Sequence, residues 1–202
     1  MNISNNQRIA FLYSSTFIVV SLFTVYLPVW LYQVKGLDLK NIGYIIGSVG
    51  IFKIFSNILI TNNLINIKAK KNAITVIGLL ILCIFFIINF FPSLDIYLST
   101  FLIFACLILF SPVLPLVENI SLSVNNNFQK SYGKLRVSGS VSFLFTVFLA
   151  GYFIDNKTVS ILPFLIIISL ILLNISVLTI PSVKTNRSNS SKGNLLDLIK
   201  NK

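Results

Sequence analysis

The chain of 202 residues contains no histidine, two cysteines and five acidic residues. Without histidine it cannot form His-liganded metal sites, Ser-His or Cys-His nucleophile pairs, or a histidine proton relay. Cys83 and Cys106 both stand inside apolar runs and offer neither a disulfide framework nor a metal-binding spacing, so both are expected to be small buried hydrophobic residues. The sequence predicts no cofactor, no metal site and no enzyme.

Charge is scarce throughout the chain. Charged residues make up 10% of it and hydrophobic residues 55%, with a mean hydropathy of +0.90. A soluble domain carries roughly 25% charged residues, so this composition predicts an integral membrane protein. The net charge of +11 does not indicate nucleic-acid binding, because the basic residues stand in gaps between apolar runs rather than on a soluble face.

Six apolar segments are long enough to cross a bilayer, which takes about 20 residues per helix. Helices are expected, because lipid cannot satisfy exposed backbone groups and the short alternating segments of a barrel are not seen. The first segment is too long for the apolar core of a cleavable signal, and we expect it to be retained as a span. The predicted spans are approximately residues 9–34, 41–62, 73–91, 95–124, 131–154 and 158–180.

The predicted all-α, polytopic bundle covers residues 1–183, and residues 184–202 are expected to form a cytoplasmic linker and the start of a juxtamembrane helix. Three of the breaks between spans hold only Lys35, Lys40 and Lys157. The opposite side is expected to hold twelve basic residues, and the positive-inside rule then places both termini in the cytoplasm, with the bacterial inner membrane as the expected location. The twelve are Arg8, Lys68, Lys70, Lys71, Lys130, Lys134, Arg136, Lys184, Arg187, Lys192, Lys200 and Lys202.

Three ionisable residues, Lys53, Glu118 and Arg136, fall well inside predicted spans. Such charges are costly and persist where they face a partner, a cavity or a substrate. A rise of about 1.5 Å per residue puts all three in the cytoplasmic half of the membrane, at depths that allow contact. We predict that Glu118 accepts hydrogen bonds from a polar substrate or takes up a proton, and that Arg136 orients the substrate. The alternatives are a structural ion pair of Glu118 with Lys53 or Arg136, and snorkelling of either cation to the interface.

Small residues gather in two of the spans. Gly43, Gly47 and Gly50 in the second, and Ser138, Gly139 and Ser142 in the fifth, predict close helix packing; the alternative is a bent backbone or one that lines a cavity.

Two stretches, LPLVEN (residues 114–119) and YGKLRVSGSVSF (residues 132–143), resemble the major facilitator superfamily, in particular its lactose-permease-like sugar–proton symporters and the phenylpropionate-permease-like branch. Those families show an acid on helix four after a proline-containing segment, and an aromatic-Gly-basic-x-Arg-x-x-Gly run opening helix five. The stretch LPVWLYQVKGLDLKNIG (residues 27–43) is similar to the branch's pattern from the end of helix one to the start of helix two. The loop TNNLINIKAKKN departs from the superfamily, since it lacks the glycine and aspartate of the usual Gly-x-x-x-Asp-Arg motif.

The resemblance implies that Glu118 and Arg136 hold substrate and that Phe143, two helical turns after Arg136, stacks on a ring of it; packing is the alternative role for one of eighteen phenylalanines. It also implies two three-helix inverted repeats that form half of a 12-helix fold, with the chain ending where a second half would begin.

We therefore predict the N-terminal half of a proton-coupled symporter for a small polar or aromatic solute such as a sugar, nucleoside or aromatic acid. Glu118, Arg136, Phe143 and Lys53 are the predicted substrate-binding residues. A second six-helix half, as a separate chain or in a homodimer, is expected as partner. The alternative is a truncated, non-transporting membrane protein or a partner-binding subunit.

Overall fold

The computed structural model describes residues 5–64, 66–91, 93–124 and 128–181, which form helices and no strand. Six helical stretches in these ranges are long and apolar enough to cross a membrane, which confirms the predicted number of spans. The predicted linker and juxtamembrane helix lie outside the described residues. The elements are α1 (Asn5–Ser21), η1 (a π-helix, Leu22–Tyr26), α2 (Leu27–Gln33), α3 (Leu39–Asn63), α4 (Ile67–Phe90), α5 (Ile96–Phe110), α6 (Val113–Val124), α7 (Phe128–Lys157), η2 (a 3₁₀ helix, Val159–Ile161) and α8 (Leu162–Thr179).

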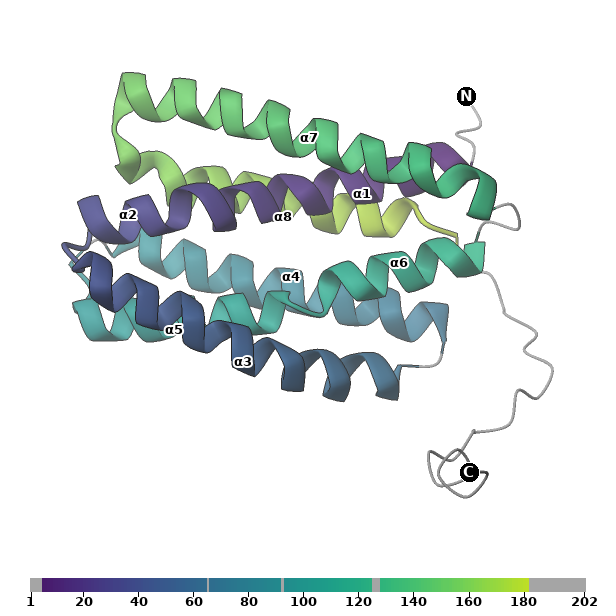
Figure 1. Cartoon of the computed structure of the whole chain (residues 1–202), viewed down its shortest axis with the longest axis horizontal. Helices are drawn as coiled ribbons and strands as arrows, with labels where there is room; N and C mark the ends of the chain where they lie inside the picture. The colour runs from purple at the N-terminus through teal and green to yellow at the C-terminus, as the bar shows by residue number, and fades with distance from the viewer. Residues whose placement is uncertain (1–4, 65, 92, 125–127, 182–202) are drawn as a thin grey trace, which may run out of the picture.

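Successive spans run in opposite directions, so that α1 begins and α8 ends at the same end of the bundle (Figure 1). Along its length α1 packs on α7 and α8, and α8 also packs on α4. The α3 helix contacts α5 and, less extensively, α2 and α6. The start of α1 and the end of α8 therefore share one membrane face, whichever face that is.

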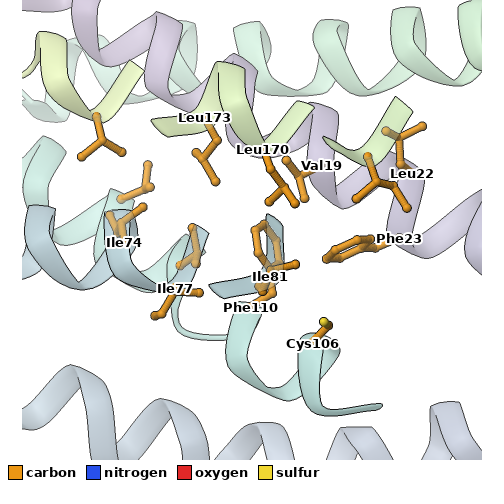
Figure 2. Packing of buried hydrophobic residues seen from close by; sticks show 14 of the residues in the cluster. Val19, Leu22, Phe23, Ile74, Ile77, Ile81, Cys106, Phe110, Leu170 and Leu173 are labelled. Carbon is orange, nitrogen blue, oxygen red and sulfur yellow. The ribbon is translucent and has the colours of Figure 1, made fainter. Parts of the chain in front are cut away.

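The core lies where α1, α4, α5 and α8 meet (Figure 2). Val19, Ile81 and Leu170 are fully buried there. The Phe23 ring stacks on Phe85 at 5.7 Å between ring centres and meets Phe110 edge-on at 5.2 Å. Since lipid tails are as apolar as these side chains, close van der Waals packing rather than exclusion from water holds the helices together.

Two of the six spans are interrupted near their middle by the effect of a proline. Pro112 has no N–H to donate to the carbonyl of Ile108, which instead accepts from Ser111 N at 3.2 Å and from Ser56 Oγ at 3.1 Å. The predicted continuous span over residues 95–124 is therefore two helices, α5 and α6. In the first span, Pro28 follows the π-turn η1, in which Leu27 N–H bonds to the carbonyl of Leu22, five residues back.

The predicted break between the second and third spans is shorter than expected. α4 begins at Ile67, so Lys68, Lys70 and Lys71 belong to its first turns rather than to a loop. Cations at a helix N-terminus face its positive dipole end. This unfavourable interaction is offset for Lys71, whose Nζ donates to the carbonyl of Ile180 at the end of α8. Arg8 Nη1 donates to the neighbouring Thr179 carbonyl at 3.0 Å.

At the opposite end of the bundle, Lys35 connects two loops. Its Nζ donates to the carbonyl of Leu94 at 3.4 Å and lies 5.6 Å from the centre of the Trp30 ring. Burial lowers the pKa of Lys35, and the nearby Asp95 carboxylate partly opposes this effect.

The two groups of small residues behave differently. A Cβ added at Gly43, Gly47 or Gly50 would meet nothing within 4 Å, so these glycines do not bring α3 close to another described helix, and their packing role stays a prediction. Gly139 does fulfil the prediction, because a Cβ there would lie 2.7 Å from a ring carbon of Phe17. The close approach of α1 and α7 thus depends on Gly139.

Candidate functional site

Glu118 and Arg136 both lie near the buried hydroxyl group of Tyr13. Glu118 on α6 is half-buried, Arg136 on α7 is exposed, and Tyr13 on α1 has 1% of its surface exposed. The Tyr13 hydroxyl group interacts electrostatically with the side chains of Glu118, Tyr132 and Arg136. Three helices therefore contribute to one polar group of residues, Tyr13, Glu118, Tyr132 and Arg136, which we call the Tyr13 cluster.

Within this cluster Arg136 is held by its own helix. Its Nη1 donates to Tyr132 Oη at 2.7 Å, and the guanidinium group lies 5.8 Å from the centre of the Tyr132 ring. Among the described residues Glu118 neither forms an ion pair nor accepts a hydrogen bond, so the alternative of a structural pair with Lys53 or Arg136 is not realised there.

Sequence reasoning missed Tyr13. Its Oη is buried and has no hydrogen-bond partner in the described part of the chain, although Ser121 of α6 lies beside it. The available signal was the polar run YSST inside the first apolar span. In that run Ser15 Oγ and Ser176 Oγ share a hydrogen bond at 2.7 Å and Thr16 donates to the Leu12 carbonyl, which leaves Tyr13 as the unsatisfied member.

The contact of Gly139 with Phe17 sets the spacing between α1 and α7 next to the Tyr13 cluster. Gly139 follows Arg136 by three residues and Phe17 follows Tyr13 by four, so each lies one helical turn from a cluster residue. Ser14 Oγ also donates to the Ser138 carbonyl at 3.5 Å in the same contact. The spacing between α1 and α7 at Gly139 therefore decides how close Arg136 lies to Tyr13.

Phe143 is half-buried on α7, two turns beyond Arg136, and none of the ring pairs among the described residues includes it. None of those ring pairs connects it to the Tyr13 cluster, and its stacking role stays a prediction.

Lys53 belongs to a different place, a partly open cavity of about 290 Å³ between the first, second and fourth spans. Leu114 of α6 also lines this cavity, and Glu118 lies one turn further along the same helix, about 6 Å away along the axis. The predicted residues are thus divided between two neighbouring positions. The cavity is lined by Val20, Phe23, Thr24, Pro28, Ile46, Val49, Lys53, Asn57, Leu107, Phe110, Ser111 and Leu114.

A larger and more open groove, of about 890 Å³, lies between α3 and α5 at the end of the bundle opposite the start of α1. Asp38 is the charged residue in its lining, beside Tyr44, Tyr97, Phe101 and Phe104. It includes none of the predicted site residues.

Comparison with known proteins decides the family. The model of the MFS_1 like family matches residues 7–201, almost the whole chain. The chain belongs to the MFS_1 like family. This confirms the resemblance to the major facilitator superfamily that the LPLVEN and YGKLRVSGSVSF stretches indicated, and with the six apolar helices it identifies an integral membrane protein of a transporter family.

This MFS_1-like chain is also similar to the protein named "Probable 3-phenylpropionic acid transporter" of Escherichia coli (strain K12), with 25% identity over 154 residues. The match covers 75% of this chain and 39% of that protein, so well under half of the relative's length is matched by the MFS_1-like chain. No solved structure matches the chain significantly.

Proposed function

We propose that the chain is the N-terminal half of a proton-coupled symporter for a small polar or aromatic solute, in a bacterial inner membrane with its termini in the cytoplasm. The observation that carries this proposal is the half-buried Glu118, which has no partner among the described residues and lies with Arg136 near one buried hydroxyl group. Its family and its relative both support transport.

The Tyr13 cluster has the parts that coupling of a proton to a solute needs. A carboxylate in a membrane is stabilised either by a nearby cation or by a proton. Arg136 is a nearby cation that Glu118 does not contact directly, since Tyr132 holds it. A solute that binds to Arg136 changes the charge next to Glu118, and the loading of Glu118 with a proton then depends on whether the site is occupied.

We further propose that a second six-helix half, as a separate chain or a second copy, packs over the faces of α3 and α7. Only 11% of the most apolar window is buried in each of these two spans, against 50% in the first span. The uncovered glycines of α3 permit another helix to approach closely. Alternating access needs two bundles that rock about a central site, which a partner half would provide.

The similar transporter indicates which class of solute to expect. The chain's similarity to the probable 3-phenylpropionic acid transporter favours an aromatic acid over a sugar or a nucleoside as the solute of this chain.

The test is uptake of labelled 3-phenylpropionate into proteoliposomes under an imposed pH gradient. The chain is reconstituted alone and with a co-expressed second half. Glu118→Gln is expected to abolish the gradient-driven uptake without changing the amount of protein in the membrane. Asp155→Asn is the matched control, because Asp155 is an exposed carboxylate at the far end of α7 and is expected to leave uptake unchanged.

Wild-type uptake by Glu118→Gln would contradict the role of Glu118. Absence of uptake by the wild-type chain in both reconstitutions would contradict transport and favour a non-transporting, partner-binding subunit.

A further inference from the structure

We propose that the cavity around Lys53 is an anion-binding site, which takes the carboxylate of a small monocarboxylic acid with an aromatic body. It lies about one helical turn from Glu118 and uses residues outside the Tyr13 cluster. That this ligand is the transported solute rests on the function proposed above. Its binding to the cavity is independent of that function.

Lys53 lies far from both ends of α3. Ten residues separate it from Asn63 at one end of the helix, and fourteen from Leu39 at the other. These separations correspond to about 15 Å and 21 Å of helix, both longer than a lysine side chain. Snorkelling to an interface therefore does not account for this charge.

The ammonium group also has no counter-charge within the described part of the chain. Lys53 is half-buried, and no described residue pairs with it or accepts a hydrogen bond from it. It is the single charged residue in the cavity lining. A lone cation inside a membrane is costly, and a bound anion removes that cost.

Two further polar groups lie beside the lysine. Asn57 follows Lys53 by four residues and faces the same cavity. Ser111 Oγ donates to Asn57 Oδ1 at 2.9 Å, which holds the amide with its oxygen toward Ser111 and leaves the amide N–H groups as donors. One ammonium and one amide form a donor pair that suits the two oxygens of a carboxylate. A dianion would keep one charge uncompensated there.

The rest of the cavity is apolar and contains aromatic rings. Phe23 and Phe110 are both buried, and Phe23 is fixed between Phe85 and Phe110. Edge-on and offset contacts with such rings favour an aromatic body in the ligand. The volume of about 290 Å³ is at the lower end of the range for small-molecule sites, which fits a compact ligand.

The backbone supports the same location. Phe23 and Thr24 belong to the π-turn η1, and Ser111 lies in the break between α5 and α6, so both interrupted spans border this cavity. π-turns occur frequently at functional sites, and discontinuous helices form the sites of many transporters.

The experiment measures binding of radiolabelled phenylacetate to the whole chain in lipid nanodiscs, without any gradient. Wild-type protein is expected to bind phenylacetate at least about tenfold more tightly than neutral phenylacetamide. The cation 2-phenylethylammonium is expected to bind no more tightly than phenylacetamide. Lys53→Met keeps the length of the side chain and is expected to weaken phenylacetate binding about tenfold or more, whereas Lys53→Arg keeps the charge and retains binding.

Lys157→Met is the matched control, because Lys157 is exposed at the end of α7 and its loss is expected to leave binding unchanged. Equal affinity for phenylacetate and phenylacetamide, unchanged binding in a folded Lys53→Met, or no phenylacetate binding by wild-type protein would each overturn the inference. Because the assay has no gradient, these outcomes are separate from the dependence of uptake on Glu118, which tests the proposed function.

Discussion

Replacement of Gly139 by alanine tests whether the approach of α1 to α7 is as close as described. The added Cβ would lie 2.7, 2.9 and 3.1 Å from the Cδ2, Cε2 and Cγ atoms of Phe17. Optimal carbon contacts are about 3.5–4.0 Å, so the ring or the helix has to move by roughly 1 Å. Overpacking of this kind costs about 1–3 kcal/mol.

Alanine also has a better helix propensity than glycine, by up to about 1 kcal/mol, which partly hides the clash. Gly133→Ala is the matched control, since it lies on the same helix and a Cβ there meets nothing within 4 Å. We expect Gly139→Ala to be less stable than Gly133→Ala by about 1–3 kcal/mol. Unfolding in mixed micelles by SDS measures both, with the buried Trp30, the only tryptophan, as fluorescence probe.

The pair Gly139→Ala and Phe17→Leu should also be coupled, because the smaller side chain relieves the clash. The double-mutant cycle is expected to return an interaction energy of about 0.5–3 kcal/mol. Equal stability of Gly139→Ala and Gly133→Ala, together with no coupling to Phe17, would refute the close approach.

Two further predictions concern single polar groups. Asp95 caps α5, where its Oδ2 accepts from Tyr97 N at 3.0 Å and from Leu98 N at 3.4 Å. Asp95→Ala should lower the free energy of unfolding by about 0.5–2 kcal/mol, whereas Asp95→Asn should nearly preserve it. An equal loss of stability in both variants would exclude the cap. Tyr13→Phe removes a buried hydroxyl group that has no hydrogen-bond partner among the described residues. It should raise the free energy of unfolding by about 1 kcal/mol and reduce gradient-driven uptake. A loss of stability would mean that the hydroxyl group does form a hydrogen bond. The exposed Tyr152→Phe is the control for Tyr13→Phe in both assays.

The sequence was most informative about the spans, because run length and the position of charges respond to the membrane alone. It was less informative about where a span breaks. Pro112 carried a readable signal for the interruption between α5 and α6, since a proline removes a helix donor. The π-turn over Leu22–Tyr26 has no such mark of its own; only the following Pro28 indicates that the helix is disturbed.

Contacts between helices depend on partners that a linear pattern does not show. Gly43 and Gly47 have the spacing of a packing motif yet face open space, whereas Gly139 is pressed against Phe17. The charges of the site show the same limit. The depth of Lys53, Glu118 and Arg136 followed from counting residues, but the separation of Lys53 into its own cavity and the unsatisfied hydroxyl of Tyr13 depend on how four spans meet.

The hydrogen bonds from Arg8 and Lys71 to the end of α8 have a consequence for biosynthesis. Thr179 ends the last of the six spans and Ile180 follows it directly, yet their carbonyls accept from Arg8, 171 residues earlier, and from Lys71, 109 residues earlier. During translation both cations are made long before their acceptors exist. Insertion of α8 is therefore the step that joins the first and third spans at this end, and a ribosome that stalls before α8 would leave an open five-span intermediate whose first and third helices carry charges without these acceptors.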